Sequence, residues 1–144
     1  MQNPPPVQTS SQPPAQVAKS STGLDENIAA LLSYIAGWIT GLVFFLIEKD
    51  SRLVRFHAMQ SLILSGGGFV VLFVLWIVVF ILSLILGQIS GILGFLVSMV
   101  FGLVATVIGI AILVGAIIAL IKAYQGQYFK LPIVGNLAEK YSAK

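Results

Sequence analysis

Cysteine is absent from this chain of 144 residues, and histidine occurs once. A protein without cysteine forms no disulfide and has no thiolate to act as a nucleophile or to bind zinc. One histidine provides no cluster of imidazoles for a metal site. We therefore expect no metal and no cofactor. A membrane enzyme would need its catalytic groups between Glu48 and His57, a run equally explained as a solvated loop, so we predict that the protein is not an enzyme.

Charged residues are also scarce in this sequence. Only 9% of the residues are Asp, Glu, Lys or Arg, and none occurs between Arg55 and Lys122, whereas soluble proteins carry about 25%. Apolar residues make up 58% of the chain, against about 45 to 50% in soluble proteins. So long a stretch without charge requires lipid rather than water as its solvent. The composition predicts an all-α integral membrane protein whose partner is the lipid bilayer and not nucleic acid.

The chain divides into segments of different composition. Residues 1–23 hold five of the six prolines among Gln, Ser and Thr, and we expect them to form a disordered tail. Residues 24–141 are predicted to form a membrane helical domain, and residues 142–144 a terminal tail. Apolar runs long enough to cross a bilayer predict spans at about 28–47, 62–86 and 92–121.

The placement of Lys and Arg decides between three and four spans, because the last apolar run is long. Three of these cations lie in the loop 48–55 and four lie after residue 121. With three spans, both basic segments share one side, and the positive-inside rule makes that side cytoplasmic. With four spans, they would face opposite sides. We therefore predict a bundle of three transmembrane helices, with four as the alternative, and a cytoplasmic C-terminus.

A short amphipathic helix is predicted after the first span. Asp50 or Ser51 can cap its first turn, and Arg52 and Arg55 then follow on one face. Because an apolar face adjoins this basic face, we expect the helix to lie in the membrane interface.

The cations near this helix are candidates for a contact. Arg52, Arg55 and Lys122, with His57 beside them, are predicted to contact an anionic lipid head group or a partner protein. The alternative is that these cations only set the topology. A proton relay through His57 is disfavoured, because the spans hold no further titratable groups, and local hydrogen bonding is expected instead.

Small residues recur at four-residue spacing within the predicted spans. This spacing lets helix backbones approach closely where lipid supplies no hydrophobic drive between helices. Packing among the helices of the chain itself and association with further copies both remain open. The candidates are Gly37, Gly41, Gly94, Ser98, Gly102 and Gly115.

Single residues and short motifs predict local features of the spans and of the C-terminal segment. Trp38 and Trp76 lie deep in their spans, so we expect both indoles to face other helices or a polar cavity. Glycines at 66–68 predict a kink or a tight helix crossing. Asn136 with Glu139 resembles a capping pair for a short terminal helix.

Four stretches carry a family resemblance: Ala29–Tyr34, Leu46–Asp50, Val54–Ser61 and Ile121–Pro132. On these stretches, and over about residues 24–141, the chain resembles the small bacterial membrane proteins similar to the twenty-kilodalton Tic subunit of the chloroplast inner-envelope import machinery. The resemblance implies a helical bundle in a bacterial inner membrane. It also implies a context of protein translocation through the plastid relatives, and no catalytic site.

Two functions remain after these exclusions. Nearly the whole chain consists of predicted spans without titratable groups. We therefore expect a non-enzymatic multi-pass protein that serves as a subunit or scaffold of a membrane assembly. Its expected partners are other membrane proteins or further copies of the chain. The alternative is a small oligomeric pore or solute pathway formed along the glycine-bearing helix faces.

Overall fold

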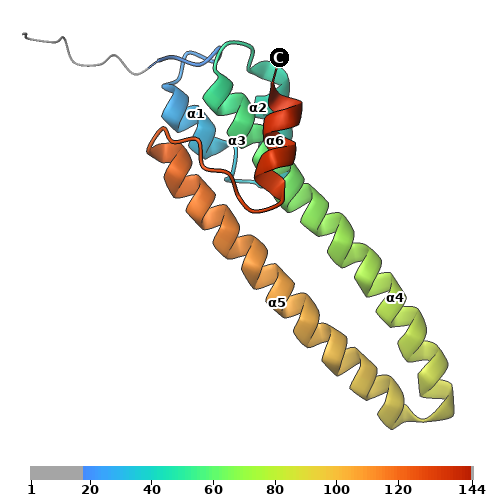
Figure 1. The fold of residues 1–144 in the computed structure, drawn as a ribbon. Coiled ribbons are helices and arrows are strands. Elements are labelled where there is room, and N and C mark those ends of the chain that lie inside the picture. Colours follow the sequence, from blue (N-terminus) through green and yellow to red (C-terminus); the bar gives the residue numbers. More distant parts are fainter. Residues whose placement is uncertain (1–17, 144) are drawn as a thin grey trace, which may run out of the picture.

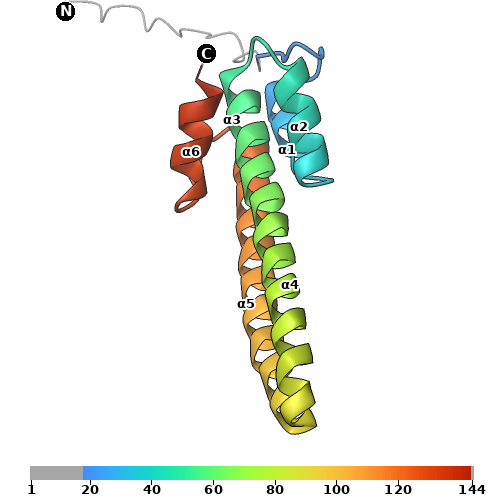
Figure 2. The same cartoon turned by 90° about the vertical axis from the view of Figure 1, so that its right-hand side faces the viewer.

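The computed structural model describes residues 18–143, and every regular element in that range is a helix (Figure 1). Short helices gather at one end of the molecule, and two long helices, α4 and α5, extend from them side by side (Figures 1 and 2). We call α4 with α5 the hairpin, and the remaining helices with the loop 125–133 the headpiece. The prediction of an all-α membrane protein is confirmed. Most of the predicted disordered tail, residues 1–17, lies outside the described residues.

The first predicted span, residues 28–47, is interrupted. α1 (Glu26–Leu32) and α2 (Trp38–Ile47) are joined by the segment 33–37 and both pack against α3 in the headpiece. Gly37 has a φ of 58°, in the left-handed region that favours glycine, and the chain reverses there. This segment therefore enters and leaves at the same end of the molecule instead of crossing to the other.

Side-chain hydroxyls satisfy the backbone of this reversal. Thr40 Oγ1 donates a hydrogen bond of 3.1 Å to the carbonyl of Ser33. Ser61 Oγ donates one of 3.1 Å to the carbonyl of Gly37. Non-helical backbone at membrane depth is tolerated only where protein groups replace the missing water. These hydroxyls make the reversal compatible with an apolar surrounding.

The second apolar run belongs to one continuous helix of 38 residues, about 57 Å long at 1.5 Å per residue. Its parts are α3 (Arg52–Ser61), the π-helical η1 (Leu62–Gly67) and α4 (Gly68–Ile89). Ser51 caps it, since its Oγ accepts a hydrogen bond from the Val54 N–H at 3.2 Å. The short helix predicted here, with Ser51 as its cap, is present as α3, but it does not lie separately in the interface: α3 is largely buried in the headpiece, and η1 carries it into α4 with no break in the helix. The glycines expected to distort the helix lie at this π-helical turn and its end.

The third run forms α5 (Gly91–Tyr124), which returns along α4 after the turn at Ser90. It is 34 residues long, or about 51 Å. The chain ends in α6 (Val134–Ser142), which packs against α3. This terminal helix was predicted, but the capping role of Asn136 was not correct: Ile133, with a φ of 68°, is the N-cap residue and no side chain caps the helix.

In the described part of the chain, two helices and not three are long and apolar enough to cross a bilayer. α4 alone, 22 residues, measures about 33 Å, close to the hydrocarbon thickness of about 30 Å. Most large side chains on both helices are exposed, Val107 for example to 67%, so these are not the core helices of a soluble fold. The three-span prediction fails at its first member because the chain reverses at 33–37, and the four-span alternative fails with it.

The two tryptophans are not enclosed as expected. Trp38 is 43% exposed and Trp76 is 61% exposed. Trp76 lies in a row of aromatic rings along α4, with its centroid 6.4 Å from that of Phe73 and 5.6 Å from that of Phe80. This indole also borders a hollow between α4 and α5, so it faces a neighbouring helix on one side and is exposed on the other.

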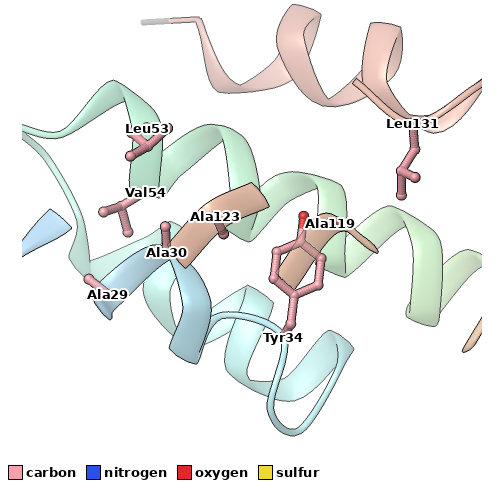
Figure 3. Close-up of a cluster of buried hydrophobic side chains, with 8 residues drawn as sticks. All are labelled: Ala29, Ala30, Tyr34, Leu53, Val54, Ala119, Ala123 and Leu131. Carbon is pink, nitrogen blue, oxygen red and sulfur yellow. The ribbon is translucent and has the colours of Figure 1, made fainter. Parts of the chain in front are cut away.

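The hydrophobic core lies in the headpiece (Figure 3). Alanines on α1 and α5 remove bulk where these helices meet, and larger side chains from α3 and the 125–133 loop fill the space around them. The buried members are Ala29, Ala30, Tyr34, Leu53, Val54, Ala119, Ala123 and Leu131.

Candidate functional site

A buried histidine at the centre of the headpiece holds the loop that follows α5. His57 is fully buried, and its Nε2–H donates to the carbonyl of Gln127 at 2.9 Å. Its Nδ1 accepts from the Tyr34 hydroxyl at 3.1 Å. Both ring nitrogens are thus used in local hydrogen bonds, in the arrangement of a neutral imidazole.

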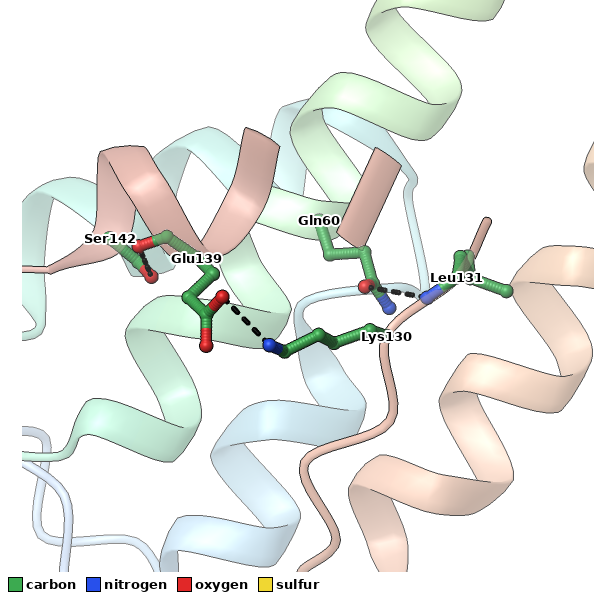
Figure 4. Close-up of polar contacts among 5 residues, drawn as sticks. All are labelled: Gln60, Lys130, Leu131, Glu139 and Ser142. Carbon is green, nitrogen blue, oxygen red and sulfur yellow. Dashed lines mark hydrogen bonds and ion pairs between the residues drawn. The ribbon is translucent and has the colours of Figure 1, made fainter. Parts of the chain in front are cut away.

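Gln60, one turn further along α3, holds the next part of the same loop. Its side chain is fully buried, and Nε2 donates to the Tyr34 hydroxyl and to the carbonyl of Phe129, each at 3.1 Å. Its Oε1 accepts from the Leu131 N–H at 3.2 Å (Figure 4). This side chain therefore pairs with loop backbone as a neighbouring strand would. Its importance was missed from the sequence, where the only signal was a polar residue on an otherwise apolar helix face.

Glu48 forms a second polar centre, between α2 and α3. The buried carboxylate accepts from the Ser21 hydroxyl at 2.8 Å and from the N–H groups of Ser21, Asp50 and Ser51 at 3.1, 3.0 and 2.9 Å. Burial by itself raises the pKa of this carboxyl, but the hydrogen bonds favour its charged form more strongly, so the pKa lies below its ordinary value. Glu48 thereby joins the two ends of the segment that reverses at 33–37.

Arg55 is used inside the headpiece. Its Nη1 donates to the carbonyl of Glu48 at 2.8 Å, and its Nε donates to the carbonyl of Ser142 at 3.4 Å. The guanidinium also lies 4.8 Å from the centroid of the Phe45 ring. This cation therefore ties α2, α3 and α6 together.

The predicted lipid-contacting set is not brought together as one site. His57 is enclosed, and Arg55 is occupied by the contacts above. Lys122 Nζ donates to the side-chain oxygens of Gln125 and Gln127 at 3.4 and 3.1 Å. Arg52 differs from these residues, because it is exposed and borders a cleft.

That cleft has a volume of about 600 Å³ and opens on the surface of the headpiece. The rings of Phe56 and Tyr128 lie in it with their centroids 5.5 Å apart. Glu139 from α6 borders it too, and its carboxylate pairs with Lys130 at 2.7 Å (Figure 4). The residues that line the cleft are Arg52, Phe56, Tyr128, Glu139, Ser142 and Ala143. Apart from Arg52, none of these was singled out from the sequence as a binding residue, because only the fold places α6 beside α3.

Some of the predicted small residues lie at close helix contacts. A Cβ added at Gly41 would lie 2.8 Å from the carbonyl oxygen of Ala58 and 2.9 Å from the nitrogen of Leu62, so α2 meets the α3–η1 junction here. A Cβ at Gly94 would lie 2.9 Å from the carbonyl oxygen of Ser83, where α4 and α5 meet near their turn.

The other small residues have different surroundings. Gly37 occupies the chain reversal, and the Ser98 hydroxyl bonds that of Ser83 at 2.8 Å across the hairpin. A Cβ at Gly115 would make ordinary contact with Leu131 at 3.8 Å. A Cβ at Gly102 would meet nothing within 4 Å.

A second hollow, also of about 600 Å³, lies between α4 and α5. Its lining is mostly aliphatic and aromatic, and its hydroxyls are already bonded: Ser83 with Ser98, and Thr106 to the carbonyl of Gly102 at 2.8 Å. We call it the hairpin groove. Its lining residues are Leu72, Leu75, Trp76, Val79, Phe80, Ser83, Ser98, Phe101, Gly102, Ala105 and Thr106.

The buried polar groups of the headpiece hold the fold together. In the described part of the chain, every buried side-chain nitrogen and oxygen has a hydrogen-bond partner. Within residues 18–143 no group of three or more His, Cys, Asp or Glu is placed to hold a metal ion. The Arg52 cleft and the hairpin groove are the candidate surfaces for a bound molecule.

These features define a class: a helical membrane protein with a hairpin of two long apolar helices and a polar headpiece at one end. The chain belongs to the magnetosome magnetite crystal formation protein family (MamF/MmsF), whose model matches residues 24–138. No solved structure matches the chain.

Similar proteins come from archaea. The UPF0132 membrane protein MJ1443 of Methanocaldococcus jannaschii is 40% identical over 126 residues, which cover 88% of this chain and 96% of the relative. A UPF0132 membrane protein of Archaeoglobus fulgidus is 38% identical over 117 residues, covering 81% and 95%. MJ1527 of M. jannaschii is 38% identical over 119 residues, covering 83% and 71%.

These matches overturn the resemblance to the Tic-related proteins. The family is MamF/MmsF, and the relatives named above are archaeal rather than bacterial. The stretches that carried the resemblance lie at the helix ends and in the headpiece, where many membrane proteins place similar interfacial residues. The context of protein translocation rested on that resemblance alone and is dropped.

Proposed function

We propose that this protein is a non-enzymatic subunit of a membrane assembly, and that partner helices contact its hairpin within the bilayer. The observation that carries the proposal is a glycine-bearing surface that the chain itself leaves uncovered. A Cβ added at Gly102 or Gly109 would meet nothing within 4 Å. Small residues on a membrane helix permit a second helix to approach closely, and dispersion contacts then favour association.

The orientation proposed with it places the headpiece in the cytoplasm. Every described Lys and Arg lies at the headpiece end, and the apolar spans separate that end from the turn at Ser90. Cytoplasmic segments carry an excess of such residues. The cations are Lys19, Lys49, Arg52, Arg55, Lys122, Lys130 and Lys140.

Single cysteines test this orientation, because the chain has none of its own. Lys49→Cys and Gln88→Cys both lie at exposed positions, the first in the headpiece and the second at the far end of α4. An impermeant maleimide added to sealed right-side-out vesicles should label Gln88→Cys, and should label Lys49→Cys only after lysis. The reverse pattern would contradict a cytoplasmic headpiece, and labelling of both positions without lysis would contradict a crossing hairpin.

Cross-linking in native membranes tests the assembly. A photoactivatable benzophenone on Leu103→Cys, 63% exposed beside Gly102, should form a discrete protein adduct whose partner is identified by mass spectrometry. The same label on Asn136→Cys, on the headpiece surface, is the control and should not form that adduct. Adding Gly102→Leu should remove the adduct by filling the contact surface. Lipid adducts alone at Leu103→Cys, or an adduct insensitive to Gly102→Leu, would refute the proposal.

The alternative of an oligomeric pore has weaker support. Conduction needs a polar or water-accessible lining, whereas the hydroxyls of Ser98 and Thr106 in the hairpin groove are bonded within the hairpin. Purified protein in liposomes should therefore show no conductance above that of empty liposomes. Reproducible single-channel currents would favour the pore instead.

The family description links other members to magnetite crystal formation. The proposal of a membrane subunit rests on the exposed surface of the hairpin alone.

A further inference from the structure

The Arg52 cleft lies just past the exposed apolar surface of α2, which extends to Ile47 and is followed by the charged residues Glu48, Lys49 and Asp50. Such a boundary between apolar and charged residues is typical of the level of lipid head groups. The outer face of α6 supports this placement, because it carries a row of exposed apolar and aromatic side chains four residues apart. They are Ile133, Leu137 and Tyr141, which are 83%, 42% and 56% exposed.

Arg52 is available to an external anion. Among residues 18–143, it takes part in no salt bridge and its guanidinium donates no hydrogen bond, in contrast to Arg55, Lys122 and Lys130. A guanidinium has a planar fork of N–H groups that matches two oxygens of a phosphate. Since Arg52 borders a cleft of about 600 Å³, a phosphate there has space for the groups attached to it.

The other side of the cleft carries the opposite charge. Glu139 brings a carboxylate that is 58% exposed, and among residues 18–143 its ion pair is with Lys130. A carboxylate accepts hydrogen bonds from a hydroxyl or an ammonium group. A lone inorganic anion would gain nothing from Glu139, whereas a molecule that joins a phosphate to a hydrogen-bond donor complements both sides.

The aromatic rings between the two charges fit the same kind of molecule. Phe56 is buried beneath the cleft, and Tyr128 is half exposed beside it. Aromatic side chains with one apolar and one polar end favour the boundary between head groups and acyl chains. The glycerol backbone of a phospholipid lies at this boundary.

We propose that the Arg52 cleft binds the head group of a membrane phospholipid, with its phosphate on Arg52 and its hydroxyl or ammonium group on Glu139. This inference does not depend on partner helices at the hairpin. The site is formed by residues of the headpiece alone, so its test is independent of the test of the proposed assembly.

Native mass spectrometry of the purified full-length chain with added phosphatidylglycerol tests the phosphate contact. Arg52→Gln should weaken binding of the first lipid about tenfold, as expected for loss of a hydrogen-bonded charge, and Arg52→Lys should weaken it less. Lys140→Gln is the matched control, since it removes a cation from the same end without touching the cleft lining, and should change the affinity less than about twofold. Equal losses for Arg52→Gln and Lys140→Gln would show diffuse surface attraction and overturn the site.

Two further arms identify the ligand. Inorganic phosphate in large excess should not displace phosphatidylglycerol; displacement would assign the cleft to free phosphate and overturn the lipid. Glu139→Gln should weaken phosphatidylglycerol, which has glycerol hydroxyls, and should leave phosphatidic acid, which lacks them, unchanged or tighter. If both lipids weaken equally, the contact proposed for Glu139 is wrong. Circular dichroism of each variant confirms that the helices are intact.

Discussion

Replacing Gln60 by alanine should release the loop that follows α5 without disturbing the hairpin. The native side chain makes three hydrogen bonds, to the Tyr34 hydroxyl, the Phe129 carbonyl and the Leu131 N–H. Alanine makes none of these, so two backbone groups lose their partner inside the headpiece. His57 still holds Gln127, which confines the effect to the second half of the loop.

The size of the effect follows from those two backbone groups. An unpartnered buried polar group costs about 1 to 3 kcal/mol, so the Phe129 carbonyl and the Leu131 N–H together cost about 2 to 4 kcal/mol once some water enters the space. Tyr34 keeps a partner in His57 and adds little. Since 1.4 kcal/mol is a factor of ten, local opening of the loop should become about 30-fold to 700-fold more frequent.

Hydrogen exchange of the detergent-solubilised protein, read by mass spectrometry on peptides covering 125–143, measures this opening. Peptides from α4 should exchange as in the parent protein. Gln125→Ala is the control, because Gln125 is exposed and the hydrogen bond of its side chain within residues 18–143 is with Lys122 in the last turn of α5, and it should change exchange less than threefold. If Gln60→Ala also leaves exchange within threefold, the hydrogen bonds of Gln60 do not hold the loop and the reasoning fails.

Three further outcomes follow from the contacts above. Gly41→Ala should destabilise the protein in denaturant titrations by about 1 to 3 kcal/mol, because its Cβ meets backbone atoms of the neighbouring helix. Gly102→Ala lies in open space and should stabilise the isolated chain by up to about 1 kcal/mol. Similar changes in stability for the two variants would contradict the tight helix crossing at Gly41. The pKa of Glu48 is lowered in the folded protein, so its contribution to stability is present above the ordinary carboxyl pKa and is lost as the pH falls through the folded pKa. Thermal melts from pH 7 to pH 3 should show this loss of stability. The Glu48→Gln variant should not show the part of the pH dependence that comes from this carboxyl. Ser83→Ala removes the hydroxyl pair with Ser98 and should cost only about 0.6 kcal/mol in the same titrations, so a loss several times larger would show that this pair does more than join the two helices.

Features set by neighbouring residues were predictable from the sequence. The charge-free run between Arg55 and Lys122 indicates helices in lipid, and α5 follows from it. The cap at Ser51 depends on a hydrogen bond three residues along the chain, which is within reach of a local pattern. Glycines at 66–68 likewise indicated a distortion where the structure has a π-helical turn and its end.

The reversal at 33–37 was not predictable in the same way. Its residues are mostly apolar, and a hydropathy pattern treats them as part of a span. The turn is stable because Ser61, 24 residues away, donates to the carbonyl of Gly37. The same holds for the Arg52 cleft, because Tyr128 and Glu139 reach it only once α6 packs on α3.

The hydrogen bonds of Gln60 set an order of events during biogenesis. Their backbone partners at Phe129 and Leu131 are 69 and 71 residues further along the chain, beyond both membrane crossings. While the ribosome is still making α5, the amide of Gln60 has the Tyr34 hydroxyl as a partner, but its Oε1 lacks the Leu131 N–H and must stay hydrated. The headpiece therefore closes last, after the second crossing has been inserted, and a chain truncated before residue 127 would leave it open for quality-control proteases to recognise.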